Sequence, residues 1–386
     1  MRKRPLRLLS VGHSYCVGLN RRLAHEVARA GGTAWEVTAV APAHFPGDLR
    51  PIACERFDGE LSRLEAVPAY LTSQVHLFVY GRRLRELARA ECDLIHCWEE
   101  PYIMAGGQVA WWTPRRVPLV FWTMQNLAKR YPPPFAQIEK YTFRRCAGWM
   151  GSGRLVVDAM QARGHGGKPH CVMPIGVDAE QFRPDPAARD AMRVRLGWTA
   201  NGAPVVGFVG RFIEGKGLGL LMRALDRIDL PWRALFVGGG PLETVLRTWA
   251  ERYGERVRIV TSVTHDQVPA YLNAIDLLCA PSQTTAHWRE QFGRMVVEAF
   301  ACGVPVVTSD SGELPYVVGD AAMVVGERDE DGWVAAIRGL IDDAALRREW
   351  AGRGREHAIA NYAWPVVARR HLDFFTELIE RGAPRN

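Results

Sequence analysis

The sequence predicts an α/β protein with two domains, each built on a parallel sheet that carries helices on both faces. Short apolar segments alternate with segments of helical periodicity along most of the chain, which is typical of strands and helices that follow one another around a parallel sheet. The alternation occurs in two runs, which meet at the Pro-containing segment 173–184. The chain of 386 residues is long enough for two domains of ordinary size.

The first run contains four predicted strands and three predicted helices. Short apolar or alternating segments predict strands over residues 6–12, 35–41, 94–98 and 119–123. Apolar residues at helical spacing predict helices over residues 20–30, 75–90 and 134–145. Gly31 and Gly32 close the first of these helices.

The second run repeats the pattern with more strands. The predicted strands are residues 205–210, 234–238, 257–261, 277–282 and 305–309. The predicted helices are residues 218–228, 242–253, 268–274 and 293–302. Gly303 stops the last helix, and Pro305 prevents it from continuing. Ligands of such sheets bind beyond the carboxyl ends of the strands, so both runs imply Rossmann-like domains with sites at those ends.

Residues 290–298 read E-Q-F-G-R-M-V-V-E and lie between two predicted strands. Glu290 precedes the helix start, and Glu298 lies about a turn and a half inside the helix, with its side chain tilted back toward that start. Amides around Phe292, Gly293 and Arg294 favour an anion there. Two carboxylates beside an anion site suit a nucleotide sugar, which carries both phosphates and hydroxyls. The alternative is an ordinary surface helix with two unrelated glutamates.

The segment 205–219 reads V-V-G-F-V-G-R-F-I-E-G-K-G-L-G. Arg211 emerges at the carboxyl end of a strand, and the glycines on either side of Lys216 allow a tight turn. An arginine fork and a lysine point charge can bind a diphosphate together. No Ser or Thr follows the lysine, so this is not a Walker loop. The alternative is a structural Gly-rich turn, although lysine is scarce in this chain, with five against 44 arginines.

Three further loops follow predicted strands. Gly239, in F-V-G-G-G-P, would allow close approach of a ligand or of the other domain, and Gly12 belongs to a similar loop in the first run. His13 in that loop and Glu99 after the strand 94–98 are candidates for a site residue. The competing interpretations are a polar loop residue for His13 and a capping or salt-bridged loop for Glu99 and Glu100.

Composition narrows the class of protein. A hydrophobic content of 48% and a charged content of 24% are typical of soluble globular chains. No run of about eighteen apolar residues predicts a transmembrane helix. The basic start is followed by an apolar stretch too short for a signal peptide. The eight cysteines are scattered without metal-ligand spacing, so we expect neither structural zinc nor disulfides, and a reducing cytoplasm.

Positive charge is concentrated in the first half. The net charge of +7 divides into +10 over residues 1–170 and −3 over the rest. An anionic partner is therefore predicted for the first half, and no recognised nucleic-acid motif is present. Basic residues cluster at the start and along one predicted helix, where 82, 85 and 89 share a face; they are Arg2, Lys3, Arg4, Arg7, Arg82, Arg83, Arg85 and Arg89. A peripheral contact with an anionic membrane and plain solvated surface charge both remain open.

Taken together, these motifs resemble the family 4 retaining glycosyltransferases of the GT-B fold. The resemblance runs over about 175–325, through G-x-V-G-R-x-x-x-x-K-G, V-G-G-G-P, the strand end A-P-S, E-x7-E, E-A-F-A-C-G-V-P-V-V and S-G-E-L-P. It implies two Rossmann-like, doubly wound domains facing each other across a cleft. Residues 1–174 would be the acceptor-side domain and residues 175–363 the nucleotide-sugar domain. Residues 364–386, which begin with Trp364-Pro365, would be a helix that crosses back.

The resemblance also implies roles. Arg211 and Lys216 look like the pair that binds the donor diphosphate, Glu290 like the residue that contacts the donor sugar, and Glu298 like the one that binds the ribose hydroxyls. Other donor-binding positions would be Gln291, Phe292, Gly293, Arg294, Val263, Gly239 and Gly12. No metal and no cofactor is expected, and the donor would be a UDP- or GDP-linked sugar.

The first half departs from the family pattern. Many members carry a histidine after the strand equivalent to 119–123, where this chain has Gln125 and Asn126. An amide cannot act as a general base at neutral pH. The acceptor-side candidates are therefore His13, Glu99, Gln125 and Asn126.

The sequence therefore predicts a cytoplasmic, metal-independent retaining hexosyltransferase, either free or peripheral at the inner membrane surface, that acts on a hydroxyl acceptor in glycan or glycoconjugate biosynthesis. The acceptor would be lipid-linked or a small molecule. The alternatives are a nucleotide-sugar epimerase or a phosphorylase of the same fold, and a protein that binds a nucleotide sugar without reacting it.

Overall fold

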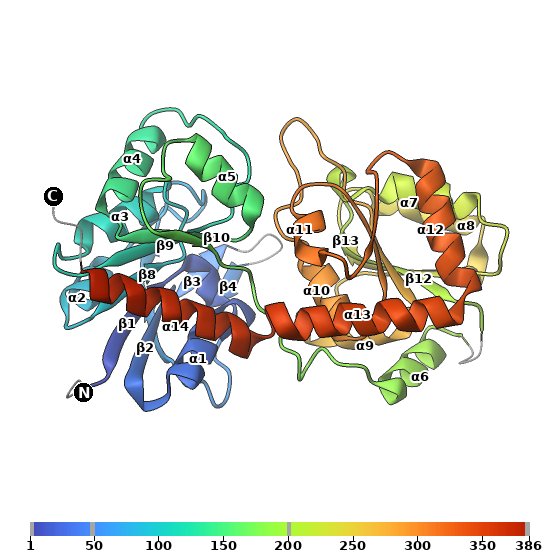
Figure 1. Ribbon diagram of the computed structural model, residues 1–386, viewed down its shortest axis with the longest axis horizontal. Helices are drawn as coiled ribbons and strands as arrows, with labels where there is room; N and C mark the ends of the chain where they lie inside the picture. The colour runs from blue at the N-terminus through green and yellow to red at the C-terminus, as the bar shows by residue number, and fades with distance from the viewer. Residues whose placement is uncertain (1–3, 47–50, 199–201, 383–386) are drawn as a thin grey trace. The chain divides into compact units, whose positions relative to one another are not determined.

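The computed structural model describes residues 4–46, 51–198 and 202–382. The chain divides into two compact units, each with its own parallel sheet (Figure 1). Unit 1 comprises the chain up to Pro174 together with the segment from Trp364, and unit 2 is Ile175–Ala363. The predicted α/β class with two Rossmann-like domains is confirmed.

The sheet of unit 1 has seven strands among the described residues, all parallel to their neighbours, in the order β11-β10-β9-β8-β1-β2-β5. Their bounds are β1 Leu6–Val11, β2 Trp35–Pro42, β5 Arg63–Val67, β8 Leu94–Cys97, β9 Leu119–Thr123, β10 Gly148–Gly151 and β11 His170–Val172. The chain builds outward from β1 in one direction through β2 and β5, and then in the other through β8. The sheet therefore has a topological switch point between β1 and β8.

The helices of unit 1 cover this sheet; they are α1 Gly18–Gly31, α2 Arg82–Arg89, α3 Met104–Trp112, α4 Phe135–Arg145, α5 Arg154–Ala162 and α14 Trp364–Arg381. Figure 1 shows the C-terminal helix α14 alongside α1, and the Arg369 guanidinium donates to the Ala30 carbonyl at 3.2 Å. Aromatic rings fix α14 to the sheet, because Phe375 lies beside Trp35 of β2 and His96 of β8. The C-terminal helix is thus part of the core of unit 1.

Unit 1 also contains two short antiparallel sheets of two strands each. One pairs β3 His44–Pro46 with β4 Pro51–Ala53, and the other pairs β6 Ala69–Tyr70 with β7 Val79–Tyr80. The second pair makes the predicted helix over 75–90 wrong in its first half. Gly81 is extended and serves as the N-cap, so the helix begins only at Arg82. The apolar residues at 75–80 satisfy a strand pairing and a turn instead of a helical face.

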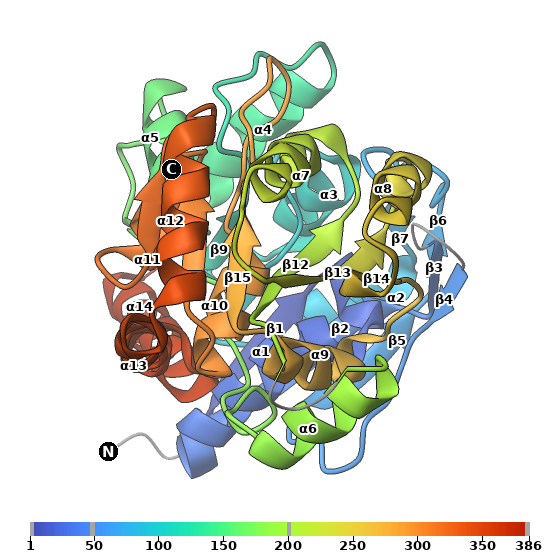
Figure 2. The same ribbon diagram turned by 90° about the vertical axis from the view of Figure 1, so that its right-hand side faces the viewer.

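The sheet of unit 2 has six strands among the described residues, again all parallel, in the order β14-β13-β12-β15-β16-β17. Figure 2 shows β14, β13, β12 and β15 next to one another in this order. The bounds of these strands are β12 Val205–Arg211, β13 Arg233–Gly239, β14 Val257–Val260, β15 Leu277–Ala280, β16 Val306–Ser309 and β17 Met323–Val325. The order again reverses in the middle of the sheet, so unit 2 has a switch point between β12 and β15.

The helices of unit 2 are α6 Pro186–Arg195, α7 Leu218–Asp226, α8 Glu243–Glu251, α9 Val268–Ala274, α10 Arg294–Ala301, α11 Leu314–Val318, α12 Glu330–Asp342 and α13 Ala344–Tyr362. One continuous core joins Phe208 of β12 to Leu221 of α7, Leu246 of α8 and Trp333 of α12. On the other side of the sheet, α10 contacts β15 and β16 and packs against α13. None of the described helices is long and apolar enough to cross a membrane.

Candidate functional site

The two switch points lie where the sequence motifs place their polar residues. In unit 2, the loops after β12 and β15 carry Lys216 and Glu290, and in unit 1 the loops after β1 and β8 carry His13 and Glu99. Ligands of open α/β sheets bind in the crevice outside the carboxyl ends of the strands at such points. Each unit therefore has one candidate site at its switch point.

The turn after β12 is built on Gly217, which has a φ of 70°. A Cβ on this residue would lie 1.7 Å from the carbonyl oxygen of Pro281, so the turn passes directly against the chain that leaves β15. Only glycine combines this φ with this approach without strain. The turn thereby fixes Lys216 beside the chain segment that leads to Glu290.

Lys216 and Glu290 form a buried ion pair. The Lys216 ammonium donates to Oε2 of Glu290 at 2.5 Å, and the Ser282 hydroxyl donates to the same oxygen at 2.9 Å. The side chains of Lys216 and Glu290 are only 11% and 8% exposed. The ring of Trp288 lies over the ammonium at 5.5 Å and packs against Gly215. A lysine so held presents its charge in a setting poor in water, where it acts more strongly than at an exposed site.

Arg211 stands at the last position of β12, exposed, and forms no ion pair with any residue that the structure describes. Its register partner on β13 is Gly239. The space beside Gly239 is open, since no atom lies within 4 Å of where a Cβ would be. This glycine leaves room next to the arginine at the carboxyl edge of the sheet.

The backbone of Glu290 is held by the S-G-E-L-P segment. The Glu313 amide donates to the Glu290 carbonyl at 3.0 Å, and Gly312 touches the same peptide so closely that a Cβ there would lie 2.2 Å from the Glu290 oxygen. The motif residues around 311–315 therefore act in part by positioning Glu290.

Helix α10 begins at Arg294, one residue later than predicted, with Gly293 as N-cap at a φ of 81°. Gln291 and Arg294 are half-buried beside this start. The Phe292 side chain is buried and lies 5.8 Å from the ring of Tyr362, centroid to centroid, so only its backbone can face a ligand.

Glu298 is buried and has a partner that the sequence reasoning missed. Nε2 of His265 lies 2.8 Å from Oε1 of Glu298. His265 opens a short turn after β14, two residues beyond the half-buried Val263. The signal available in the sequence was a histidine in the loop that follows a predicted strand, but its contact with Glu298, 33 residues away, cannot be read from spacing.

In unit 1 the structure joins His13, Glu99 and Tyr80. The buried Glu99 carboxylate lies 2.5 Å from Nδ1 of His13, and it also accepts the His13 amide and the Tyr80 hydroxyl, each at 2.5 Å. Burial works against a charged imidazole, but the adjoining Glu99 carboxylate outweighs it and raises the pKa of His13 above its usual value. Nε2 has no partner within the part of the chain that the structure describes.

The loop after β9 carries Gln125 and Asn126, the two acceptor-side candidates with side-chain amides. Asn126 is buried and Gln125 is half-buried, and the backbone N–H of Gln125 donates to the Thr123 hydroxyl oxygen at 3.3 Å. Glu100 braces this loop by accepting from the Thr123 hydroxyl at 2.6 Å and from the Met124 amide at 2.9 Å. Burial raises the pKa of Glu100 to about 7. Gly12 packs at the start of the His13 loop, where a Cβ would approach Trp98 to 3.1 Å.

The basic residues of unit 1 are arranged less uniformly than predicted. On α2, Arg82 and Arg89 are exposed, Arg85 is half-buried, and Arg83 pairs with Glu65 and Glu86. At the start of the chain, Arg4 and Arg7 are neutralised by carboxylates of three residues, Glu36, Glu91 and Asp93. Arg2 and Lys3 lie outside the described residues. Among the described residues, the cationic face of α2 thus depends on Arg82 and Arg89, the two exposed arginines of this helix that form no ion pair.

Residues 197–357 match the family of glycosyl transferases group 1. The chain is 35% identical to the GDP-mannose-dependent alpha-(1-6)-phosphatidylinositol monomannoside mannosyltransferase of Mycolicibacterium smegmatis over 207 residues, which is 51% of this chain and 54% of the relative. The chain therefore spans about half the length of the first curated relatives that it matches.

Two other similarities extend over more of the chain. The D-inositol 3-phosphate glycosyltransferase of Kineococcus radiotolerans is 29% identical over 393 aligned residues, covering 86% of both chains. HepE of Anabaena, solved in complex with UDP and glucose, superposes with a TM-score of 0.73 at 19% identity and covers 96% of this chain and 100% of its own. The chain accordingly has the GT-B fold of two Rossmann-like units, and its unit 2 carries the segment that matches the group 1 glycosyl transferases.

Proposed function

We propose that this chain is a retaining, metal-independent hexosyltransferase that moves a hexose-type sugar from a UDP- or GDP-linked donor to a hydroxyl acceptor in glycan or glycoconjugate biosynthesis. The observation that carries the proposal is the Lys216–Glu290 pair at the switch point of unit 2, inside the segment that matches the family. The names of the relatives support both donor classes, since one is GDP-mannose-dependent and HepE was solved with UDP.

On the donor side, Arg211 and Lys216 would bind the diphosphate, and Glu290 would accept from hydroxyls of the sugar. Glu298 would accept from the ribose diol, in place of its present contact with His265. The open space at Gly239 leaves room for the diphosphate beside Arg211. The remaining donor contacts would come from the start of α10 and the loop after β14, through Gln291, Phe292, Gly293, Arg294 and Val263.

The reaction would break the bond between the anomeric carbon and the diphosphate oxygen and form a bond from that carbon to the acceptor oxygen on the same face. The proton of the acceptor hydroxyl would be taken up by a base on the acceptor side, and the diphosphate would leave as nucleoside diphosphate. Negative charge grows on the diphosphate as its bond to the sugar breaks, and the charges of Arg211 and Lys216 stabilise it. Fixed charges of this kind lower a barrier without needing to reorganise during the reaction.

Release of nucleoside diphosphate tests the function directly. Incubation with GDP-mannose or UDP-glucose, without acceptor, should give slow hydrolysis of one of these donors, with the same rate in EDTA. A protein that only binds the nucleotide sugar would release nothing, and an epimerase would change the sugar without freeing the nucleotide.

We propose that His13 is the acceptor-side residue of unit 1, oriented by Glu99. An imidazole whose Nδ1 is fixed by a buried carboxylate presents Nε2 in a defined direction, which is the arrangement of a histidine that handles a hydroxyl proton. Gln125 and Asn126 would contribute hydrogen bonds rather than proton transfer. The relatives named above include enzymes of lipid-linked and of small soluble inositol compounds, so the proposed acceptor is a hydroxyl of either kind.

Replacement of His13 with glutamine should lower transfer to acceptor by roughly a hundredfold and leave donor binding unchanged. The wild-type rate should fall as the pH drops through the His13 pKa, which the Glu99 carboxylate raises above 6.5, because only the neutral ring accepts the hydroxyl proton. This limb should be absent in His13→Gln. The exposed His44 gives the control, and His44→Gln should behave like wild type. Equal pH profiles in wild type and His13→Gln would contradict the role.

We also propose a peripheral contact of unit 1 with the cytoplasmic face of an anionic membrane through Arg82 and Arg89. Each basic residue near such a surface contributes about 1 kcal/mol, so Arg82→Gln/Arg89→Gln should bind phosphatidylglycerol vesicles roughly thirtyfold more weakly. Arg195→Gln/Arg348→Gln removes two exposed charges from unit 2 and serves as the control. Sedimentation at physiological salt measures the binding, and wild-type protein left wholly in the supernatant would contradict the contact.

A further inference from the structure

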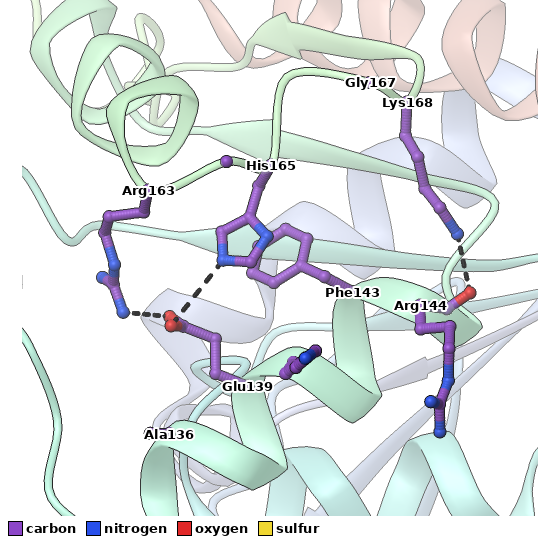
Figure 3. A pocket seen from close by; sticks show the side chains of 10 residues that line it. Ala136, Glu139, Phe143, Arg144, Arg163, His165, Gly167 and Lys168 are labelled. Carbon is purple, nitrogen blue, oxygen red and sulfur yellow. Dashed lines mark hydrogen bonds and ion pairs between the residues drawn. The ribbon is translucent and has the colours of Figure 1, made fainter.

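A cavity of about 570 Å³ lies in unit 1, lined by helix α4 and by the loop between α5 and β11 (Figure 3). The loop reads R-G-H-G-G-K over residues 163–168 and leads into the amino end of β11. His13, Glu99 and Asn126 instead follow the carboxyl ends of their strands. Because all strands of this sheet are parallel, the cavity loop lies at the opposite edge from the candidate acceptor site.

The lining of the cavity is strongly basic. Its charged side chains are Lys140, Arg144, Arg163, Lys168 and a single acid, Glu139. Glu139 is paired with Arg163 and lies 3.7 Å from Nε2 of His165. Lys140, Arg144 and Lys168 form no ion pair with any carboxylate that the structure describes. The cavity therefore has three cations that no acid compensates.

Two of these cations are lysines, and this chain has only five. The strong preference for arginine accounts for scattered surface arginines, such as Arg115 and Arg116. It does not account for two lysines on one cavity.

Arg163 is the fourth cation of the lining. Its side chain is 10% exposed, and its buried Nη1 has no hydrogen-bond partner among the residues that the structure describes. The guanidinium is held over the ring of Tyr131 at 4.6 Å while it pairs with Glu139. Arg163 and Glu139 therefore form a charge-paired, buried edge of the cavity.

The ordinary explanation is that these cations complement the carboxyl ends of α4 and α5, which both terminate here. Lys168 does so, because its ammonium donates to the carbonyl of Arg144 at 2.8 Å and to that of Cys146. Lys140 and Arg144 make no such contact with a helix end in the part of the chain that the structure describes. In Figure 3 the stacked rings of Phe143 and His165 lie between Arg163 and Lys168. The cavity therefore has an aromatic surface with a basic side chain on either side of it.

We propose that this cavity binds a phosphate-bearing ligand, separate from the nucleotide-sugar donor. The phosphate oxygens would contact Lys140 and Arg144, and the Phe143–His165 stack would contact the rest of the ligand. The phosphate would belong to a soluble metabolite or to a lipid headgroup, and both present the same chemistry to the cavity.

Calorimetric titration of the full chain with inorganic pyrophosphate tests the proposal. The wild type should bind at two sites, the donor site and the cavity. Lys140→Gln/Arg144→Gln should weaken one of them by roughly tenfold or more, since losing even one charged contact is worth at least about 1.4 kcal/mol. Arg115→Gln/Arg116→Gln, which removes two exposed arginines of unit 1 outside the cavity, should leave both sites intact. Both changes are at exposed positions and should not affect folding.

The variant Lys216→Ala separates this site from the donor site. It should remove the donor-site component and leave the cavity component in place. Abolition of all pyrophosphate binding by Lys216→Ala alone, or unchanged binding in Lys140→Gln/Arg144→Gln, would overturn the cavity proposal without touching the donor site. Sedimentation with phosphatidylglycerol and phosphatidylcholine vesicles then separates the sources. A vesicle defect in Lys140→Gln/Arg144→Gln identifies a lipid headgroup, and unchanged vesicle binding with lost pyrophosphate binding identifies a soluble phosphate.

Discussion

Replacement of Lys216 with alanine should lower the turnover of the nucleotide-sugar donor by roughly 10² to 10³-fold, the usual effect of removing one preorganised charge from a transition state. The buried ammonium sits at the carboxyl edge of β12, where a diphosphate leaving group would gain its charge. Donor affinity should fall less than turnover, because the charge on the diphosphate grows only as the bond to the sugar breaks. Steady-state release of nucleoside diphosphate measures both quantities.

Because Lys216 forms a buried ion pair with Glu290, Lys216→Ala should also lower the stability of unit 2. Lys216→Ala leaves the buried Glu290 carboxylate without its counter-ion, and breaking a buried pair in this way costs about 3–5 kcal/mol of stability. The double variant Lys216→Met/Glu290→Gln removes both charges and should recover most of that stability. It should remain inactive, since neither charged group is restored. Recovery of turnover in the double variant would show that Lys216→Ala had acted only by unfolding unit 2.

Glu298 provides the matched contrast on the same site. Glu298→Gln keeps the shape of the side chain but weakens its acceptance from the ribose diol, so donor affinity should fall by roughly 1–2 kcal/mol with little change in turnover. Wild-type turnover in Lys216→Ala would contradict the diphosphate role. Unfolding of Glu298→Gln would show that the contact of Glu298 with His265 is structural.

The fold was predictable from the sequence because each element carries its own local signal. The apolar segments predicted as strands over 205–210 and 277–282 correspond to the buried parallel strands β12 and β15, of which β15 ends at Ala280, and the glycines around Lys216 indicate a turn that only glycine can make. Alternation of strand and helix then fixes parallel sheets, with Arg211 and Glu290 near their carboxyl edge. The helix over 75–90 failed because its apolar residues pair with β6 across a turn, and no local periodicity encodes that pairing.

The pairings within the sites were not predictable in the same way. Glu99 meets His13 across 86 residues, and Lys216 meets Glu290 across 74. These contacts depend on which strands become neighbours at the switch points, and strand order is a property of the whole sheet. The same holds for His265, which reaches Glu298 from the loop after a strand at the sheet edge, β14. Sequence motifs therefore identified the candidate residues, but which of them lie next to one another depends on the strand order of the folded sheet.

The core of unit 1 contains a pair of buried histidines that should make this unit sensitive to acid. His96 of β8 and His371 of α14 lie with ring centroids 6.0 Å apart. His371 donates from Nδ1 to the Val367 carbonyl, and His96 shares Nδ1 with the Ser10 hydroxyl, which in turn bonds Tyr15. Nε2 of each ring is buried and has no hydrogen-bond partner within the described ranges 4–46, 51–198 and 202–382. Neither ring can gain a proton in this core without burying an uncompensated charge.

We expect the thermal transition of unit 1 to move to lower temperature as the pH falls from about 6.5 toward 4. Burial lowers the pKa of His371 to about 4 and that of His96 well below its usual value. In this pH range the unfolded state therefore binds more protons than the folded state. The contribution of these neutral histidines to the free energy of unfolding is therefore fully present above the ordinary histidine pKa of 6.5. It is lost as the pH falls toward the folded-state pKa, and for His371 alone the loss is about 3 kcal/mol. Scanning calorimetry of the full chain between pH 4.5 and 8 measures this shift. His371→Leu should flatten the dependence, and His76→Gln, at an exposed position of the same unit, should leave it as in wild type. If His371→Leu loses stability with falling pH as steeply as wild type does, the acid sensitivity of unit 1 arises from other groups.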